Sequence, residues 1–264
     1  MSKVWLITGS SRGIGRKVAE AALLAGEQVV ATARKLEGLH ELVDQHGDRI
    51  RTVQHDVRDA SAAATAVQTA VDAFDRIDVV VNAARSADPT VEDFSVDSFR
   101  VPMETNLFGF VYLIQAAFPI LRQRGSGHII QISPAGSRVN LGGFSAHQIS
   151  KQAVERFTVE LARDLAPLGI KVTTVETGGT RNTRLEPDVP VISEPFNENV
   201  IAPSQGAGAH DRQGPNDPGE IARLILRTAE MAEPPLRLLV GSEATHYLTD
   251  ASQALGELEA KWRN

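Results

Sequence analysis

Short runs of β-branched and aliphatic residues alternate with longer segments of helical periodicity along most of this chain. The expected strands are Val4–Thr8, Gln28–Ala33, Ile50–Gln54, Asp78–Asn82, His128–Ser133, Lys171–Glu176 and Leu236–Val240. Runs such as Val79–Val81 are apolar throughout, which is typical of strands that are covered on both faces. The alternation therefore predicts an α/β fold, with a parallel sheet of about seven strands and helices on both of its faces.

The helical patterns lie between these strands, with one long interruption. The expected helices cover residues 14–25, 37–46, 60–74, 103–122, 147–166 and 243–263. Residues 177–218 break the rhythm with repeated prolines, and such a stretch inside a compact domain is usually a functional lid or a disordered segment. The apolar residues Val191, Ile192 and Phe196 favour a lid, which would cover a substrate site, rather than a disordered segment. No linker or internal repeat divides the chain, so we expect residues 1–264 to form a single domain.

Composition excludes several classes of function. The chain has 27 basic and 33 acidic residues, which gives a net charge of −6, and its basic residues are scattered rather than gathered as a nucleic-acid-binding face requires. It has no cysteine, which excludes disulfides, thiol catalysis and thiolate metal sites. The apolar run Val4–Ile7 is too short for a signal peptide, and no stretch approaches the length of a membrane span. We expect a cytoplasmic protein that binds a small-molecule substrate.

A glycine-rich turn joins the first expected strand to the first helix. Its glycines would let the backbone approach a pyrophosphate, and the helix N-terminus offers amide donors and the positive end of a dipole. The strand–loop–helix context makes this a dinucleotide site of the Rossmann type, in a doubly wound sheet. The predicted contacts in the turn are Thr8, Gly9, Ser11, Arg12, Gly13, Ile14 and Gly15.

The end of the second strand bears on the choice of cofactor. Sites that select NAD place a carboxylate there to bind the ribose 2′-hydroxyl. This chain has Ala33-Arg34-Lys35 at that point and no acid. Arg12 and Arg34 would form a cationic clamp for a 2′-phosphate, with charge-assisted bonds. One such arginine is commonly only a surface residue, but the pair favours NADP(H).

The glycine spacing, TGxxxGxG rather than GxGxxG, is the point at which the chain resembles the short-chain dehydrogenase/reductase family. The resemblance extends over essentially the whole chain, including the last expected strand. It implies that Asp56 holds the adenine amino group and that Asn82 opens a motif that normally reads Asn-Asn-Ala-Gly. The further cofactor contacts that the resemblance implies are Asp56, Val57, Asn82, Lys151, Gly178 and Thr180.

The same resemblance implies a catalytic set of Ser, Tyr and Lys, which acts with an Asn on a neighbouring helix. Lys151 and Asn106 match the family's Lys and Asn. The position of the Tyr holds His147, and the position of the Ser holds Pro134. Ser133 is a possible stand-in, although alternation along a strand would turn it to the other face. The chain therefore departs from the family pattern at two of its main catalytic positions.

These replacements change the chemistry that we expect. Histidine titrates near pH 6.5, so His147 could serve as an acid or a base, but nearby Lys151 would favour its neutral form. Pro134 has no donor, so a substrate oxyanion would lose one partner. Reduction of an ordinary ketone should therefore be slow. Arg85, in place of the motif's Gly, and Arg138 would together suit an anionic or carbonyl-bearing substrate, although such arginines are more often simply exposed.

Three functions remain open. The first is a divergent NADP(H)-dependent oxidoreductase for a small carbonyl, imine or alcohol, with Asn106, His147, Lys151 and Ser133 as candidate catalytic residues. The second is a non-redox cyclase, isomerase or dehydratase, and the third is a catalytically inactive NADP(H)-binding protein. The surviving turn Thr8–Gly15, Arg34 and Asp56 favour cofactor binding under all three functions, and the expected lid favours an enzyme. The helices at 103–122 and 147–166 match those through which the family forms dimers and tetramers, so we expect a homodimer or homotetramer.

Overall fold

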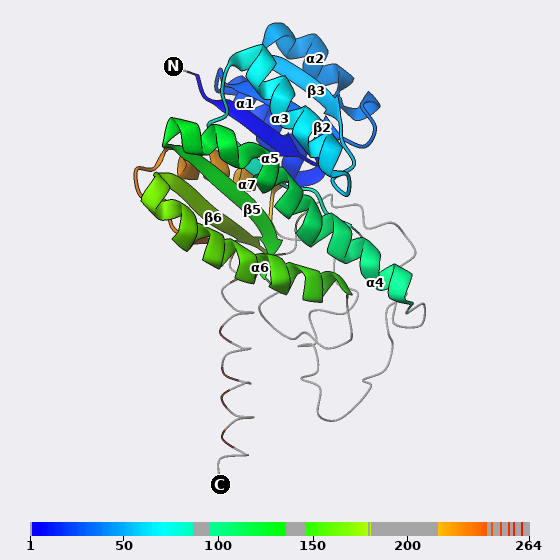
Figure 1. Cartoon of the computed structure of the whole chain (residues 1–264), viewed down its shortest axis with the longest axis vertical. Coiled ribbons are helices and arrows are strands. Elements are labelled where there is room, and N and C mark those ends of the chain that lie inside the picture. The colour runs from blue at the N-terminus through cyan, green and yellow to red at the C-terminus, as the bar shows by residue number, and fades with distance from the viewer. Residues whose placement is uncertain are drawn as a thin grey trace.

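The computed structural model describes residues 2–86, 95–135, 146–178, 180 and 216–241, together with residues 244, 249, 253, 256 and 260. Within these residues, seven strands form one parallel sheet in the order β3-β2-β1-β4-β5-β6-β7 (Figure 1). The strands are β1 Val4–Thr8, β2 Gln28–Ala33, β3 Ile50–Gln54, β4 Val79–Asn82, β5 Gly127–Pro134, β6 Ile170–Thr177 and β7 Arg237–Val240. The α/β fold with a seven-stranded parallel sheet is confirmed, and every strand boundary lies within one residue of the predicted one.

The strand order indicates which edge of the sheet is suited to bind a ligand. The chain winds from β1 outward to β3 and then returns to the other side of β1 with β4, so the winding reverses between β1 and β4. Open parallel sheets bind ligands at the carboxyl ends of the strands on either side of this switch point. Thr8 pairs with Asn82 there, which brings the end of the first strand beside the end of the fourth.

Helices cover both faces of the sheet, because successive residues of a buried strand point to opposite sides. Trp5 and Ile7 pack on the face that α1 and α7 cover, whereas Leu6 packs on the face of α3, α5 and α6. Figure 1 shows α5 and α6 lying in front of the sheet. The helices are α1 Gly13–Leu24, α2 His40–His46, α3 Ala60–Phe74, α4 Val96–Pro102, α5 Gly109–Arg124, α6 Ala146–Leu165 and α7 Pro218–Glu230.

Helix α7 was not predicted. Asp217 caps its start by accepting a hydrogen bond of 2.8 Å from the Gly219 amide, and Pro218 occupies the first turn, where a missing N–H costs nothing. Its apolar face, with Ile221 and Ile225, is buried against α1. Asp217 and Pro218, which the sequence places at the end of the irregular stretch 177–218, therefore mark the start of a helix.

The predicted lid, residues 177–218, lies mostly outside the described residues, as do Val191, Ile192 and Phe196. Its two ends are described: Thr180 and Asn216 form an isolated parallel bridge. Of the predicted last helix, 243–263, the structure describes only single positions. That residues 1–264 form a single domain therefore stays a prediction.

The helix predicted from Met103 begins earlier, at Val96. Helix α4 continues through a π-helical turn, Met103–Phe108, into α5. Pro102 sits at the junction, and a proline inside a helical pattern suggests a boundary from sequence alone because it removes a hydrogen bond. Here it stands inside one continuous helical run.

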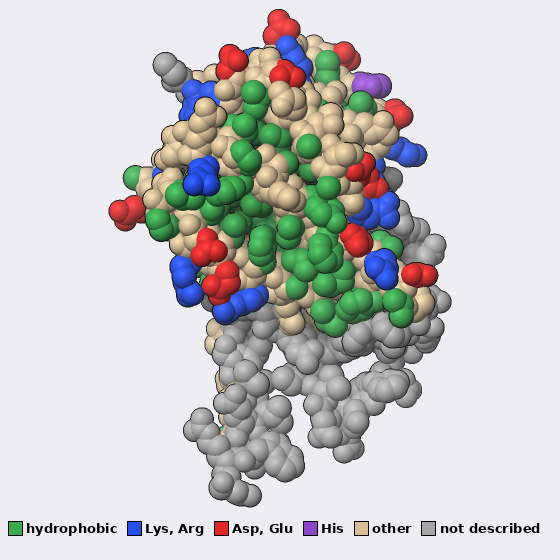
Figure 2. Space-filling model, in the orientation of Figure 1, with side chains coloured by type: hydrophobic (Ala, Val, Ile, Leu, Met, Phe, Trp, Pro, Cys, Tyr) green, Lys and Arg blue, Asp and Glu red, His purple; other side chains and the backbone are tan. Residues whose placement is uncertain are grey.

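This run also corrects the prediction that no stretch approaches the length of a membrane span. Phe99–Arg124 has 26 residues and a mean hydropathy of 1.2, which is enough for a span by length and composition. Phe110, Leu113 and Leu121 of this run are buried in the core on the α6 side of the sheet, as in the core helix of a globular protein. Figure 2 shows that apolar side chains also gather on the outer surface over α5 and α6.

Candidate active site

The glycine turn after β1 has a backbone that only glycine adopts without strain. Gly9 and Gly13 have φ angles of +67° and +61°, in the left-handed region. A Cβ on Gly15 would lie 2.5 Å from the Gly9 carbonyl oxygen, so glycine is required there for close packing of helix on turn. Helix α1 then starts with no side-chain cap and no acid in its first turn. Its first amides therefore face an open position suited to an anion.

The loop after β2 lies against this turn. A Cβ on Gly38 would be 3.2 Å from the Ser11 Cβ, and the Ser10 amide donates to the Thr32 carbonyl at 2.9 Å. These contacts bring the segments that carry Arg12 and Arg34 side by side, and both arginines are exposed. Two separate cations at this point suit a phosphate, as the sequence predicts.

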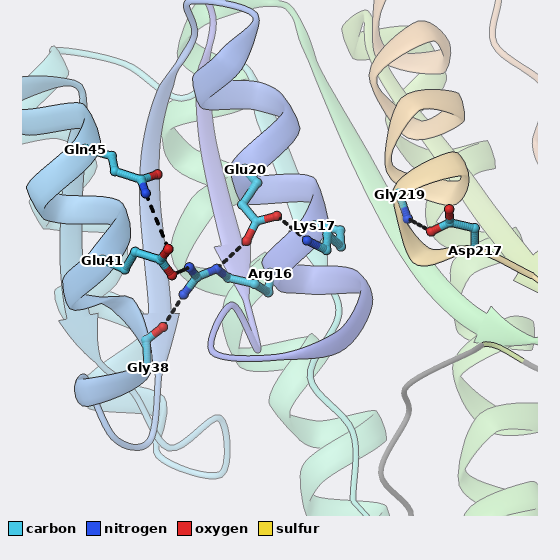
Figure 3. A network of polar contacts seen from close by, with 8 residues as sticks. All are labelled: Arg16, Lys17, Glu20, Gly38, Glu41, Gln45, Asp217 and Gly219. Carbon is cyan, nitrogen blue, oxygen red and sulfur yellow. Dashed lines mark hydrogen bonds and ion pairs between the residues drawn. The ribbon is translucent and has the colours of Figure 1, made fainter. Parts of the chain in front are cut away.

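Arg16 also joins α1 to the loop after β2 and to α2 (Figure 3). Its guanidinium pairs with Glu41 of α2 at 2.8 Å and with Glu20 of α1 at 2.7 Å, and it also donates to the Gly38 carbonyl. The side chain is largely buried, whereas Glu41 is exposed. Arg16 therefore fixes the loop after β2 against α1.

Asp56, the predicted adenine contact, follows β3. Its carboxylate forms a forked ion pair with Arg58, at 3.0 Å from Nε and 2.6 Å from Nη2. This hydrogen bonding lowers the pKa of Asp56 to about 2, so the group is ionised at neutral pH. Val57, its predicted companion, packs against Gly109 at the start of α5.

A chain of buried hydrogen bonds runs from the glycine turn across three strands. Thr8 Oγ1 donates to Asn82 Oδ1 at 2.9 Å, and Asn82 Nδ2 donates to Gln131 Oε1 at 2.8 Å. Gln131 Nε2 donates to the Ile132 carbonyl at 2.7 Å, and Lys151 Nζ donates to the same carbonyl at 3.4 Å. The network therefore connects the predicted phosphate site to the predicted catalytic lysine.

The ammonium group of Lys151 is buried and poorly hydrogen-bonded by the described residues. Its side chain comes from α6 and is 2% exposed, and the long bond to Ile132 is the hydrogen bond that the described residues give it. Burial, with a smaller effect of Arg85, lowers its pKa to about 8. A buried cation with a single weak partner is unfavourable unless a ligand supplies further acceptors.

His147 and Asn106 are in contact beside Lys151. Asn106 Nδ2 lies 3.4 Å from His147 Nδ1 and donates to Ser150 Oγ at 2.8 Å, while Asn106 Oδ1 accepts from the Ser86 amide at 3.3 Å. Burial, Lys151 and Arg85 together lower the pKa of His147 to about 3. The imidazole is therefore neutral at physiological pH.

Ser133 has a different partner. Its hydroxyl donates to Glu155 of α6 at 3.2 Å, one turn beyond Lys151, and both groups are buried. Pro134, the next residue, ends β5 and has no donor. The structure thus brings Asn106, His147 and Lys151 together, whereas Ser133 is committed to Glu155.

Gly178 and Thr180 follow β6, whose end lies beside that of β5. The Gly178 amide donates to the Val240 carbonyl at 3.3 Å, and Thr180 Oγ1 donates to the Gly178 carbonyl at 3.3 Å. These residues therefore border the same edge of the sheet from the side opposite the glycine turn.

The sequence interpretation missed two buried polar residues of the site, Gln131 and Glu155. Gln131 interrupts an apolar strand, and Glu155 stands four positions after Lys151 on the same helix face. Both signals are readable, since a polar residue in a buried strand needs a partner. Of the two arginines that the sequence predicts for substrate binding, the structure describes Arg85, whereas Arg138 lies outside the described residues.

Comparisons with known proteins agree with this geometry. A family model described as short chain dehydrogenase matches residues 3–190. Oxidoreductase BOA17 of Botryotinia fuckeliana is 43% identical over 267 residues, covering 100% of this chain and 97% of that protein. A short-chain dehydrogenase structure from Streptomyces avermitilis has 33% identity and a TM-score of 0.86, covering 99% and 97%. A short chain dehydrogenase from Burkholderia cenocepacia in complex with NADP has 25% identity and a TM-score of 0.75, covering 100% and 98%.

Proposed function

Because the chain belongs to the short-chain dehydrogenase family, we propose that it is an NADP(H)-dependent oxidoreductase for a small organic carbonyl, imine or alcohol. The observation that carries the proposal is the buried ammonium of Lys151. Within the described part of the chain it has one hydrogen bond, of 3.4 Å, and buried hydrogen bonds link it to the glycine turn. Such a cation is stabilised by the ribose hydroxyls of a dinucleotide that enters from the turn.

The residues present fit NADP(H). The open amides at the start of α1 would hold the pyrophosphate, and Arg12 with Arg34 would hold the 2′-phosphate. No acid stands at the end of β2, where an NAD site needs one. When bound, the cofactor supplies or accepts a hydride. The bound NADP of the Burkholderia cenocepacia relative supports the same choice.

Lys151 Nζ holds the transferable proton of the site. Its pKa of about 8 keeps it protonated at neutral pH yet able to release a proton to a substrate that becomes basic. His147, with a pKa of about 3, is neutral and can only orient or accept. Asn106 positions the imidazole, since its amide contacts both the ring and Ser150.

The substrate should be reactive by itself. Pro134 has no donor, and the Ser133 hydroxyl is bonded to Glu155, so neither supplies a hydroxyl contact to a developing oxyanion. Loss of one such donor typically slows acyl-transfer enzymes by about 100- to 1000-fold. We therefore propose an activated carbonyl or an iminium rather than a simple ketone.

The test compares the wild type with a double variant, Pro134→Ser/His147→Tyr. NADPH binding is measured first by fluorescence, and NADPH consumption is then followed with simple ketones and diketones. We expect both proteins to bind NADPH and the double variant to reduce simple ketones at least about 10-fold faster. Equal rates on simple ketones would refute the impaired proton relay. Product formation without NADPH consumption would refute the redox assignment, and lack of NADPH binding would refute the cofactor assignment.

We also propose that the protein is a homo-oligomer through the outer face of α4, α5 and α6. Val101 of α4 is 43% exposed and Phe108, in the π-helical turn before α5, is 41% exposed. Apolar side chains also gather on the outer surface over α5 and α6 (Figure 2). Exposed apolar patches of this kind mark interaction sites. Light scattering on the wild type should report at least a dimer, and Phe108→Glu should shift the protein toward a monomer. A monomeric wild type would refute the proposal.

A further inference from the structure

We propose that Arg58 is a positioning residue for the cofactor: it fixes the Asp56 carboxylate in the orientation that selects a base with a hydrogen-bond donor. Adenine, which has an amino group at its 6-position, fits this acceptor, whereas a base with a 6-oxo group does not. The inference rests on the proposed function, in which the protein binds NADP(H), and adds a residue that decides which dinucleotide is accepted. The family resemblance covers Asp56 and Val57 and assigns Arg58 no role.

Asp56 lies beside the segment that carries Arg34. The His55 amide donates to the Ala33 carbonyl at 2.9 Å. Gln54 Nε2 donates to the Arg34 carbonyl at 3.2 Å, so the end of β3 is held against the end of β2. In NADP(H) the 2′-phosphate and the adenine are attached to the same ribose, so a residue that contacts the base must lie near those that hold the phosphate. The Asp56 side chain, which is 37% exposed, meets this condition.

The backbone around Asp56 is fixed by packing and by hydrogen bonds. Val57 is buried against Gly109, where a Cβ would come within 2.9 Å of the Val57 Cβ. The Asp59 amide donates to the Asp56 carbonyl at 2.9 Å, and the Asp59 side chain caps the start of α3. The main chain therefore leaves only the orientation of the Asp56 side chain to be set.

Arg58 sets that orientation. Its backbone amide donates to Asp56 Oδ1 at 3.1 Å, its Nε donates to Oδ1 at 3.0 Å, and its Nη2 donates to Oδ2 at 2.6 Å. An ionised carboxylate has about four acceptor positions, so these donors leave room for one on a bound base. The hydrogen bonds from Arg58 also lower the pKa of Asp56 to about 2. Because exposed ion pairs add little to stability, the main consequence of this pair is a carboxylate with a fixed charge and direction.

A carboxylate held in this way discriminates between bases. It accepts hydrogen bonds and cannot donate one, so it is complementary to the 6-amino group of adenine and repels the 6-oxo group of hypoxanthine. A carboxylate free to rotate would lose conformational freedom on binding adenine and could turn away from the oxo group. Loss of Arg58 should therefore weaken the discrimination between the two bases rather than the binding of every dinucleotide.

The experiment compares NADPH with its hypoxanthine analogue, in which a 6-oxo group replaces the 6-amino group. Both carry the reduced nicotinamide, whose fluorescence reports binding without turnover. The variants are Arg58→Gln, Arg58→Lys, Asp56→Asn and the double variant Asp56→Asn/Arg58→Gln. Arg163→Gln is the matched control, because Arg163 is also an exposed arginine paired with an acid, Glu160, but on the surface of α6.

We expect the wild type to prefer NADPH by about 10- to 100-fold, the range that a hydrogen bond to a charged group gives. Arg58→Gln should reduce this preference by about 3- to 10-fold, the range for ordering one side chain. Arg58→Lys should retain part of the preference, and Arg163→Gln should match the wild type. In the Asp56→Asn background, Arg58→Gln should have no further effect on the preference, because Arg58 acts through Asp56.

Equal affinity of the wild type for the two dinucleotides would overturn the proposal. So would a loss in Arg58→Gln that is the same for both dinucleotides, or a change in preference that persists in the Asp56→Asn background. A greater preference for NADPH in Arg58→Gln would also overturn it, because the guanidinium would then be the group that contacts the base. A wild type that binds neither dinucleotide would instead refute the proposed function, so the two failures are distinguishable.

Discussion

Replacing Lys151 by methionine should make the free protein more stable and, at the same time, reduce its stabilisation by NADPH. Methionine has a similar length and no charge, so it removes the buried ammonium and leaves little empty volume. Among the described residues, this ammonium has a single hydrogen bond, of 3.4 Å, to the Ile132 carbonyl. A position that is unfavourable without its ligand is expected in a functional site.

The magnitude follows from the lowered pKa. Lys151 falls from 10.5 to about 8, and 2.5 pKa units at 1.36 kcal/mol each give about 3 kcal/mol of preference for the neutral form in the folded state. Below pH 8 the lysine is protonated in both states, so the folded protein bears this whole cost. Between pH 8 and 10.5 the unfolded chain binds more protons, so wild-type stability should rise with pH.

The assay is urea unfolding of the wild type and of Lys151→Met at neutral pH and near pH 10, with and without NADPH. At neutral pH we expect the variant to exceed the wild type by about 2–3 kcal/mol, and near pH 10 the difference should shrink to below about 1 kcal/mol. NADPH should raise the stability of the wild type more than that of the variant. A variant less stable than the wild type at neutral pH, with the same difference near pH 10, would show that the ammonium is well solvated and would refute the reasoning.

Three further predictions concern other parts of the molecule. Arg12→Ala and Arg34→Ala should each weaken NADPH binding by about 10-fold or more and leave NADH binding unchanged in fluorescence titrations; equal loss for both cofactors would contradict the phosphate clamp. His128 is buried with a pKa lowered to about 4 by burial, so between pH 6.5 and 4 the unfolded state binds more protons and stability should fall by about 3 kcal/mol. His128→Gln should lose about that much less over the same range in urea titrations, and an identical loss would refute the assignment. Asp217→Ala should cost about 1 kcal/mol through loss of the α7 cap, measured by thermal unfolding against Asp72→Ala as a surface control.

The strands were predictable because short runs rich in β-branched and aliphatic residues mark them without knowledge of the neighbouring elements. β1 and β3 begin and end where the sequence pattern does. The helices depended more on context. Pro218 begins α7, and Pro102 lies within a continuous helical run. From sequence alone each proline indicates a break in a helix, because the pattern does not show which backbone carbonyl loses its hydrogen-bond donor.

The candidate site was predictable only in part, for a similar reason. A motif at helix spacing indicates Lys151 and His147, which are neighbours on one face of α6. Whether the ring is neutral or charged depends on burial and on Arg85, which belongs to a loop distant in sequence. The partner of Ser133 likewise depends on how α6 packs over β5. Pairings across elements of this kind are a property of the folded chain.

The bridge between Thr180 and Asn216 has a consequence for how this protein changes over time. The bridge holds Thr180 and Asn216 side by side, so the separation of these two residues does not depend on how many residues join them. Doubling the length of a closed flexible loop costs only about 0.6 kcal/mol of closure entropy. Insertions, deletions and whole replacements there should therefore be nearly neutral for stability. Changes of sequence and length between Thr180 and Asn216 therefore offer related enzymes a route to new substrates without redesign of the sheet or the cofactor site.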